Sequence, residues 1–149
     1  MTDTQQFCTF FVDDLFLGVE VERVQEVIRH QKTTRVPLAT QAIGGLINLR
    51  GQIVTAIALR SRLELPERQD QRELMNVVVR TEDGAVSLLV DEIGDVVEVD
   101  QDDFEPPPDT LQGTAREMIR GAFKMKDKLL LCLDTQCAIR GFRSADAAA

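Results

Sequence analysis

The chain has 149 residues, 44% of them hydrophobic and none of them Trp or Tyr, so it can bury one modest core or two small ones. Its formal net charge is -8, and no cluster of Lys and Arg offers the basic surface that general nucleic-acid binding requires. The sequence has neither a run of about 20 apolar residues nor a leader-like N-terminal stretch, so we expect a cytoplasmic protein that does not insert into a membrane.

Strand-like runs separated by turn residues recur along the whole chain. Asp13 and Asp14 separate residues 7–12 from 15–21, and turn residues at 82–84 and 126–128 each separate two further runs. This spacing predicts hairpins, and therefore a mostly β architecture of small barrels or a sandwich.

Helical patterns are few. Residues 21–29 place Val21, Val24 and Val27 or Ile28 at separations of three, four and seven residues, which predicts one short amphipathic helix. A second helix is predicted over 135–142, with Asp134 as its N-cap. Residues 65–73 are predicted to form a polar loop, 104–110 a stiff proline-rich connector and 144–149 a disordered tail.

A fourth hairpin is predicted in the stretch GGLINLRGQIVTAIAL. Gly51 and Gln52 suit the two central positions of a type II′ turn, with residues 46–50 and 53–58 as the paired strands. Glycine explains the turn, but it does not explain a charged Arg50 at the end of a strand. The Arg50 side chain therefore needs a partner from elsewhere in the chain.

A search for catalytic or metal-binding patterns finds none. The single histidine, His30, has no neighbour in sequence with which it could act as a general base. Cys132 and Cys137 lack the Cys-x-x-Cys spacing of a zinc site, and together with Cys8 they are interpreted as small buried hydrophobic residues without disulfides. We therefore expect no enzyme, no cofactor and no metal.

The net charge comes mostly from one segment. Residues 91–105 hold eight acids and no base, which leaves 17 acids against 17 bases in the rest of the chain. The segment lacks the alternating acids and central glycine of a calcium loop. We interpret it as solvated turns and edge-strand charges that oppose aggregation, with ion binding as the alternative.

Four stretches of the chain read GVEVERVQEVIR, TTRVP, GGLINLRGQIV and LLVDEIGDVVEV. Their order and spacing, over residues 7 to about 142, are similar to the CheW family, the coupling proteins of bacterial chemotaxis arrays. The piece GLINLRG at 45–51 is the most specific, followed by the VD pair ahead of Gly94 and Val96. The fold also occurs in the kinase CheA and in CheV, but a chain that starts at its own Met and ends soon after the last strand resembles the free-standing adaptor.

The resemblance implies a fold of two small five-stranded, Src-homology-like β-barrels side by side, with one or two short helices. It implies a single domain over 5–143, with about 13–66 as the first barrel, about 67–143 as the second, and an N-terminal strand that either barrel can use. The number of predicted hairpins agrees with this fold independently.

The resemblance also implies a non-enzymatic adaptor that joins the tip of a chemoreceptor to the regulatory domain of a CheA-type histidine kinase. Such a protein is expected to be monomeric in isolation and to be recruited from the cytoplasm to membrane-associated receptor arrays. Glu26 and Arg50 match positions where the family places an acid and a base that can pair, which would give Arg50 its partner. The implied receptor groove comprises Val24, Ile28, Gly45, Leu49, Arg50, Gly51 and Val96, and the implied kinase-binding residues are Val27, Thr33, Arg35, Val36 and Pro37.

The chain departs from the family pattern at three places. Thr55 stands where a proline is frequent, and Ala58 removes an acid that often lies close to Arg60. Ser87 replaces a glycine ahead of the VD pair, which is expected to narrow or shift the groove. For Val24 and Leu49, the alternative to a place in the groove is a plain core position. For the protein as a whole, one alternative function is that of an adaptor of a pilus-motility or other chemosensory pathway. The other is a ligand- or metal-binding sensor barrel.

Overall fold

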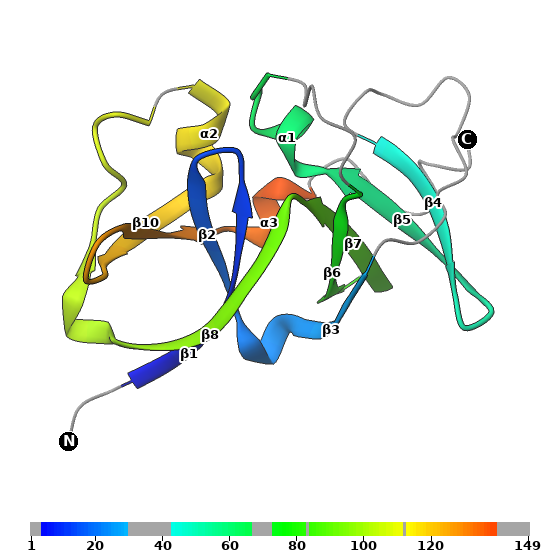
Figure 1. Ribbon diagram of the computed structural model, residues 1–149, viewed down its shortest axis with the longest axis horizontal. Helices are drawn as coiled ribbons and strands as arrows, with labels where there is room; N and C mark the ends of the chain where they lie inside the picture. Colours follow the sequence, from blue (N-terminus) through cyan, green and yellow to red (C-terminus); the bar gives the residue numbers. More distant parts are fainter. Residues whose placement is uncertain (1–3, 30–42, 67–72, 83, 112, 140–149) are drawn as a thin grey trace.

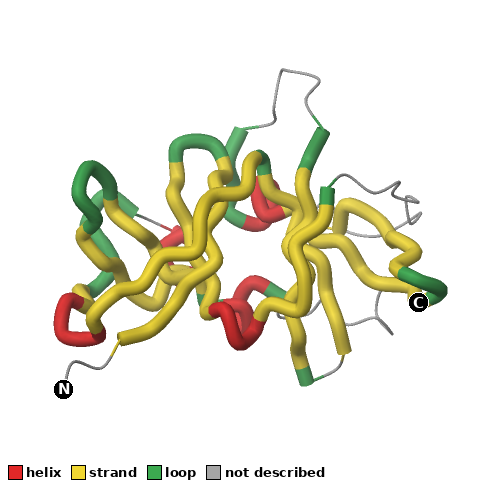
Figure 2. The backbone as a smooth tube through the Cα atoms, turned by 60° about the horizontal axis from the view of Figure 1, so that its bottom comes forward, coloured by secondary structure: helices red, strands yellow, loops and turns green. Residues whose placement is uncertain are grey.

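The structure is a computed structural model that describes residues 4–29, 43–66, 73–82, 84–111 and 113–139. Its strands form two sheets, one of six strands and one of five, that lie next to each other (Figures 1 and 2). The predicted mostly β fold is confirmed, and in place of the expected one or two short helices the described residues hold three short α-helices and two 3₁₀ turns. The larger sheet exceeds the expected five strands because the two-residue strand β9 extends it.

The six-stranded sheet combines strands from both ends of the described chain. Its order is β8-β1-β2-β11-β10-β9, and all neighbours are antiparallel except β2 and β11. The predicted hairpins around Asp13-Asp14 and around 126–128 join β1 to β2 and β10 to β11. The strands are β1 Thr4–Val12, β2 Leu15–Glu20, β8 Glu92–Asp100, β9 Phe104–Glu105, β10 Ile119–Lys124 and β11 Leu129–Leu133.

The five-stranded sheet comes from the middle of the chain. Its order is β3-β6-β7-β5-β4, with a parallel pair between β5 and β7. The strands are β3 Val24–Ile28, β4 Ile43–Leu49, β5 Gln52–Ala58, β6 Met75–Thr81 and β7 Gly84–Val90. The expected subdomain boundary at residues 66 and 67 does not coincide with the boundary between the sheets, because β6 and β7 pair with β3 and β5.

The helix predicted over residues 21–29 is wrong. A single 3₁₀ turn, η1 Val21–Arg23, is followed directly by strand β3. β-branched residues favour a strand here, and the register between β3 and β6 shifts between Val24 and Glu26. Such a bulge adds one residue and interrupts the alternation, so the apolar spacing looks helical although the chain is extended.

The helix predicted after Asp134 is present as α3, Thr135–Ala138. The Asp134 carboxylate accepts a hydrogen bond from the Cys137 backbone N–H at 3.1 Å, as expected of an N-cap. The predicted end of this helix lies outside the described residues. Sequence patterns did not indicate three other short elements, because none is long enough to show a periodicity: α1 Leu59–Arg62, η2 Gln101–Asp103 and α2 Gly113–Met118.

The largest hydrophobic cluster draws side chains from both sheets. Each sheet also has a smaller cluster of its own, around Phe7 and Phe123 in the six-stranded sheet and around Ile47 and Val54 in the five-stranded sheet. Because the shared cluster belongs to neither sheet alone, the two sheets are packed against each other as one body. Its members include Phe10, Val12, Leu17 and Val19 from one sheet and Val77, Val79, Leu88 and Val90 from the other.

A charged cluster links α1 to the β1–β2 turn and to the start of β8. Arg60 Nη2 donates to Asp91 Oδ2 at 2.5 Å, and Arg60 Nη1 lies 3.5 Å from Asp13 Oδ1. The same Asp91 oxygen accepts the Asp13 backbone N–H at 2.7 Å. Asp91 and Asp13, from distant parts of the chain, therefore supply Arg60 with the acidic contact that the alanine at position 58 cannot provide.

Ser87 is fully buried in β7 and faces no open groove, contrary to expectation. Its hydroxyl donates to Asn76 Oδ1 at 2.7 Å, and Asn76 Nδ2 donates to the Arg29 carbonyl at 3.2 Å. The extra side chain therefore serves a buried hydrogen-bond chain that connects β7, β6 and the end of β3.

Thr55 gives a direct test of the core of the five-stranded sheet. Its side chain is 1% exposed, and its hydroxyl has no hydrogen-bond partner in the described part of the chain. Burying an unpartnered hydroxyl is unfavourable, so Thr55→Val is expected to raise the free energy of unfolding by about 1 kcal/mol in urea denaturation.

Thr9→Val is the matched control for this prediction. The Thr9 hydroxyl is equally buried but donates to the Asp95 carbonyl, so its loss is expected to lower the free energy of unfolding. Equal losses in both variants would show that the Thr55 hydroxyl is also partnered.

Candidate interaction surface

The β4–β5 hairpin turns at Arg50 and Gly51, one residue earlier than predicted. Leu49 pairs with Gln52, so Arg50 and Gly51 are the central residues, with φ angles of 54° and 87°. Two positive φ angles identify a type I′ turn and not the predicted type II′ turn. The Gly51 backbone N–H donates to Asn48 Oδ1 at 2.9 Å, which explains a polar Asn48 just before the turn.

The Arg50 side chain reaches the carboxylate of Glu26. Arg50 Nη1 lies 3.0 Å from Glu26 Oε2, and Arg50 Nη2 lies 3.1 Å from Glu26 Oε1. This two-pronged geometry is the directional form of an arginine–carboxylate pair. The Glu26 side chain is 16% exposed and that of Arg50 is 78% exposed, so the pair joins a largely buried acid to a solvated base.

This ion pair connects the two opposite edges of the five-stranded sheet. Glu26 lies on β3, and Arg50 follows directly on β4. In a flat sheet the outer strands of five would be roughly 19 Å apart, so the contact requires the sheet to curl. Of the neighbouring residues, Leu49 belongs to the small hydrophobic cluster of this sheet and Ile28 packs against it.

The other predicted groove residues do not share one environment. Val24 packs against the cluster shared by both sheets, because the bulge in β3 turns it away from the face that carries Ile28. Leu49 is only 8% exposed and Gly45 is buried, whereas Val96 is 57% exposed on β8 of the other sheet. The structure thus brings together Glu26, Arg50 and Gly51, and it leaves Val96 on a separate strand.

Among the predicted kinase-binding residues, Val27 is described and is 39% exposed on β3. Thr33, Arg35, Val36 and Pro37 lie outside the described residues, as does His30. Two further large apolar side chains are exposed, Ile53 at 57% and Phe104 at 44%. Sequence analysis missed both; the only signal for Ile53 was its position directly after a polar turn.

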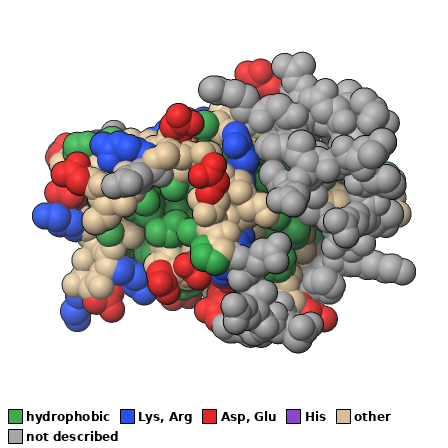
Figure 3. Space-filling model, turned by 90° about the horizontal axis from the view of Figure 1, so that it is seen from above, with side chains coloured by type: hydrophobic (Ala, Val, Ile, Leu, Met, Phe, Trp, Pro, Cys, Tyr) green, Lys and Arg blue, Asp and Glu red, His purple; other side chains and the backbone are tan. Residues whose placement is uncertain are grey.

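Seen from above, hydrophobic side chains gather over the half of the molecule that holds the six-stranded sheet, with charged side chains around them (Figure 3).

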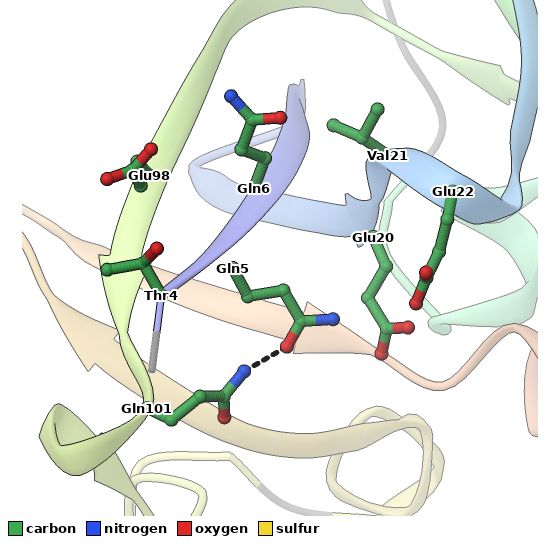
Figure 4. Close-up of a pocket in the computed structure, with 8 residues that line it drawn as sticks. All are labelled: Thr4, Gln5, Gln6, Glu20, Val21, Glu22, Glu98 and Gln101. Atoms are coloured by element: carbon green, nitrogen blue, oxygen red, sulfur yellow. Dashed lines mark hydrogen bonds between the residues drawn. The ribbon is translucent and has the colours of Figure 1, made fainter. Parts of the chain in front are cut away.

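A polar pocket of about 730 Å³ lies beside β1, where Gln101 donates a hydrogen bond to Gln5 (Figure 4). Its lining contains a single apolar residue: Thr4, Gln5, Gln6, Glu20, Val21, Glu22, Glu98 and Gln101.

Reactive and metal-binding groups do not converge within the described ranges. No group of three or more His, Cys, Asp or Glu side chains there could hold a metal ion. Burial raises the pKa of the Cys132 thiol to about 12, so this cysteine stays neutral and unreactive at physiological pH. None of the helices in this part of the chain is long and apolar enough to cross a membrane.

Exposed apolar side chains on both sheets, together with an ion pair that orders a hairpin, are properties of a protein that binds other proteins. The comparisons with known proteins agree with this class. The family model for the CheW-like domain matches residues 6–141. The chain therefore belongs to the CheW family.

Individual relatives cover nearly the whole chain. "Chemotaxis protein CheW" of Bacillus subtilis is 31% identical over 135 residues, which are 91% of this chain and 86% of that protein. "Chemotaxis protein CheW" of Treponema pallidum is 29% identical over 87% of this chain and 78% of that protein. The crystal structure of scaffolding protein TtCheW from Thermoanaerobacter tengcongensis is similar with a TM-score of 0.78 and 26% identity, over 89% of both chains.

These relationships confirm the predicted function class. The protein is a non-enzymatic scaffold of chemotaxis signal transduction that couples receptors to a kinase.

The Arg50 turn gives a prediction that separates backbone strain from the ion pair. A left-handed arginine is unfavourable by roughly 1–2 kcal/mol, and glycine escapes that strain. Arg50→Gly and Arg50→Ala both remove the ion pair, but only Arg50→Gly relieves the backbone. Arg50→Gly is therefore expected to be more stable than Arg50→Ala by about 1 kcal/mol in denaturant unfolding.

A double-mutant cycle on Arg50→Ala and Glu26→Ala measures the pair itself. Because the Arg50 side chain is 78% exposed, the coupling energy is expected to be below about 1 kcal/mol. A coupling of about 3 kcal/mol or more would instead show that both charges are buried.

Proposed function

We propose that this protein binds a chemoreceptor tip and the regulatory domain of a CheA-type histidine kinase through two separate surfaces. The observation that carries the proposal is the exposure of large apolar side chains on both sheets, Val27 on β3 and Val96 on β8, in a member of the CheW family. An exposed apolar side chain on a strand contributes little to its own fold, but it gains favourable burial in a complex.

The receptor is proposed to lay an amphipathic helix along the surface that includes Val96 and the β4–β5 turn. Recognition of this kind buries the apolar face of a helix against apolar side chains. Val96 and Arg50 are exposed enough to touch the helix directly. The less exposed members of the implied groove are proposed to shape this surface: the buried Gly45 and Leu49, the partly buried Val24 and Ile28, and Gly51 in the turn.

The kinase regulatory domain is proposed to dock on β3 and the segment that follows it. Val27 would be the apolar contact on the strand, and Thr33, Arg35, Val36 and Pro37 would extend the same surface. Val27 is cross-strand to Val77, so it lies on the face of β3 opposite to Glu26. The ion pair with Arg50 therefore leaves Val27 free for a partner.

Each contact is expected to be weak by itself. Small interfaces of this sort gain strength when many copies are held together, as in a receptor array. The protein is accordingly proposed to be a cytoplasmic monomer that assembles at membrane-associated receptor arrays.

The two surfaces can be separated by reciprocal substitutions. Val96→Asp places a charge that must be desolvated on docking, so it is expected to weaken receptor binding at least tenfold and to leave binding of the isolated kinase regulatory domain unchanged. Val27→Asp is expected to have the opposite pattern. Binding is measured by titration calorimetry with a purified receptor cytoplasmic fragment and a purified kinase regulatory domain.

Each variant is the folded control for the other. Circular dichroism and the unfolding midpoint of both variants should stay close to the wild type, because both side chains are exposed. Loss of both partners in a single folded variant would contradict the assignment of two separate surfaces.

A further inference from the structure

Two arginines share one buried carboxylate where β2, η1 and β10 meet. Glu20, the last residue of β2, is 9% exposed. Its oxygens accept from Arg120 Nη2 at 2.7 Å and from Arg23 Nε at 3.2 Å. Burial raises the pKa of the Glu20 carboxyl, but the charges and hydrogen bonds of Arg120 and Arg23 outweigh burial and hold that pKa below its ordinary value. Glu20 is therefore ionised at neutral pH.

Both arginines keep unused hydrogen-bond donors. A guanidinium carries five N–H donors. Arg23 and Arg120 each give one nitrogen to Glu20 and make no other hydrogen bond in the described part of the chain. Their side chains are 41% and 43% exposed, so the remaining N–H groups can reach a ligand from solvent. Glu20 meanwhile fixes the direction in which these groups point.

These donors line a small pocket of about 240 Å³. At roughly 30 Å³ for each water of liquid volume, the space corresponds to about eight waters and suits a small organic anion. The end of β11 and the start of α3 supply the rest of the lining, which comprises Glu20, Arg23, Arg120, Leu133, Asp134, Thr135 and Gln136.

The charges of the lining select the kind of anion. Arg23 and Arg120 are balanced by Glu20 and Asp134, and the Asp134 carboxylate is already engaged with the Cys137 backbone N–H. A neutral lining gives no long-range attraction, so binding depends on directed hydrogen bonds. A guanidinium can pair bidentately with either a carboxylate or a phosphate, but the two fixed negative charges of the lining repel a doubly charged phosphate more strongly than a singly charged carboxylate.

We propose that this pocket binds a small monocarboxylate through the free N–H groups of Arg23 and Arg120. The apolar contact with Leu133 favours a short aliphatic chain on the ligand over a hydrated inorganic anion. None of the lining residues belongs to the proposed receptor or kinase surfaces, so the site is independent of the proposed function.

The test is a titration of the isotope-labelled protein with propionate at constant ionic strength, followed by the NMR signals of the arginine side chains. The Arg23 and Arg120 signals are expected to shift and saturate with propionate, and chloride and phosphate are expected to produce no saturating shift. Arg23→Gln and Arg120→Gln should each weaken propionate binding. Arg116→Gln is the matched control, because Arg116 donates to the carbonyls of Pro108 and Leu111 and should not affect the affinity.

Glu20→Gln is expected to increase the affinity for propionate, and an unfolded variant cannot produce such an increase. The substitution removes one fixed negative charge from the pocket and keeps an amide oxygen that still accepts from the arginines, so propionate is expected to bind several-fold more tightly and phosphate binding should appear. Should Arg120→Gln fail to fold, Arg23→Gln and Glu20→Gln still decide the question. An absent saturating shift in the wild type, equal shifts with chloride, or unchanged affinity in Arg23→Gln and Glu20→Gln would each overturn the proposal.

Discussion

The hydrophobic cluster shared by the two sheets is the interaction on which the rest of the structure depends. The chain starts the six-stranded sheet with β1 and β2, builds the whole five-stranded sheet, and then returns to complete the first sheet with β8 to β11. Strand β11 pairs in parallel with β2, so the first sheet is complete only once the last described strands are in place. Because the cluster joins side chains from both sheets, the exposed Val27 and Val96 are held at a fixed separation, as a scaffold requires.

Charged side chains add further links between parts of the chain that are distant in sequence. The Glu26–Arg50 pair holds the two edges of the five-stranded sheet together, and Arg60 ties α1 to Asp91 and Asp13. An exposed ion pair contributes only about 0–1 kcal/mol, so its main effect at Arg50 is to fix the position of a hairpin. The side chains of Arg60 and Asp91 are less exposed, at 17% and 13%. Removing one of them would break this ion pair and leave the charge of the other in a largely buried position.

Local turn chemistry explains which elements the sequence predicted correctly. The hairpin at Asp13-Asp14 and the cap at Asp134 depend on neighbouring residues alone, and both are present. The predicted helix over residues 21–29 is wrong because the bulge in β3 arises from pairing with β6, which no local pattern reveals. The turn at Arg50 and Gly51 lies one residue earlier than predicted, because the Asn48 side chain accepts a hydrogen bond from the Gly51 backbone N–H. Asp13 and Asp91, which pair with Arg60, and Arg120, which pairs with Glu20, lie far from these residues in the chain, so local spacing does not indicate them. The pairing of Glu26 with Arg50 is indicated by family resemblance alone.

A scaffold that couples a receptor to a kinase must hold both partners at the same time. The most direct measurement is calorimetric titration of the purified kinase regulatory domain into this protein, first alone and then saturated with a receptor cytoplasmic fragment. Two separate surfaces on one rigid body predict an affinity for the kinase domain that is unchanged or higher in the presence of the receptor fragment. A strong decrease, with the kinase domain displacing the receptor fragment, would show that both partners use one surface and would contradict the proposed scaffold geometry.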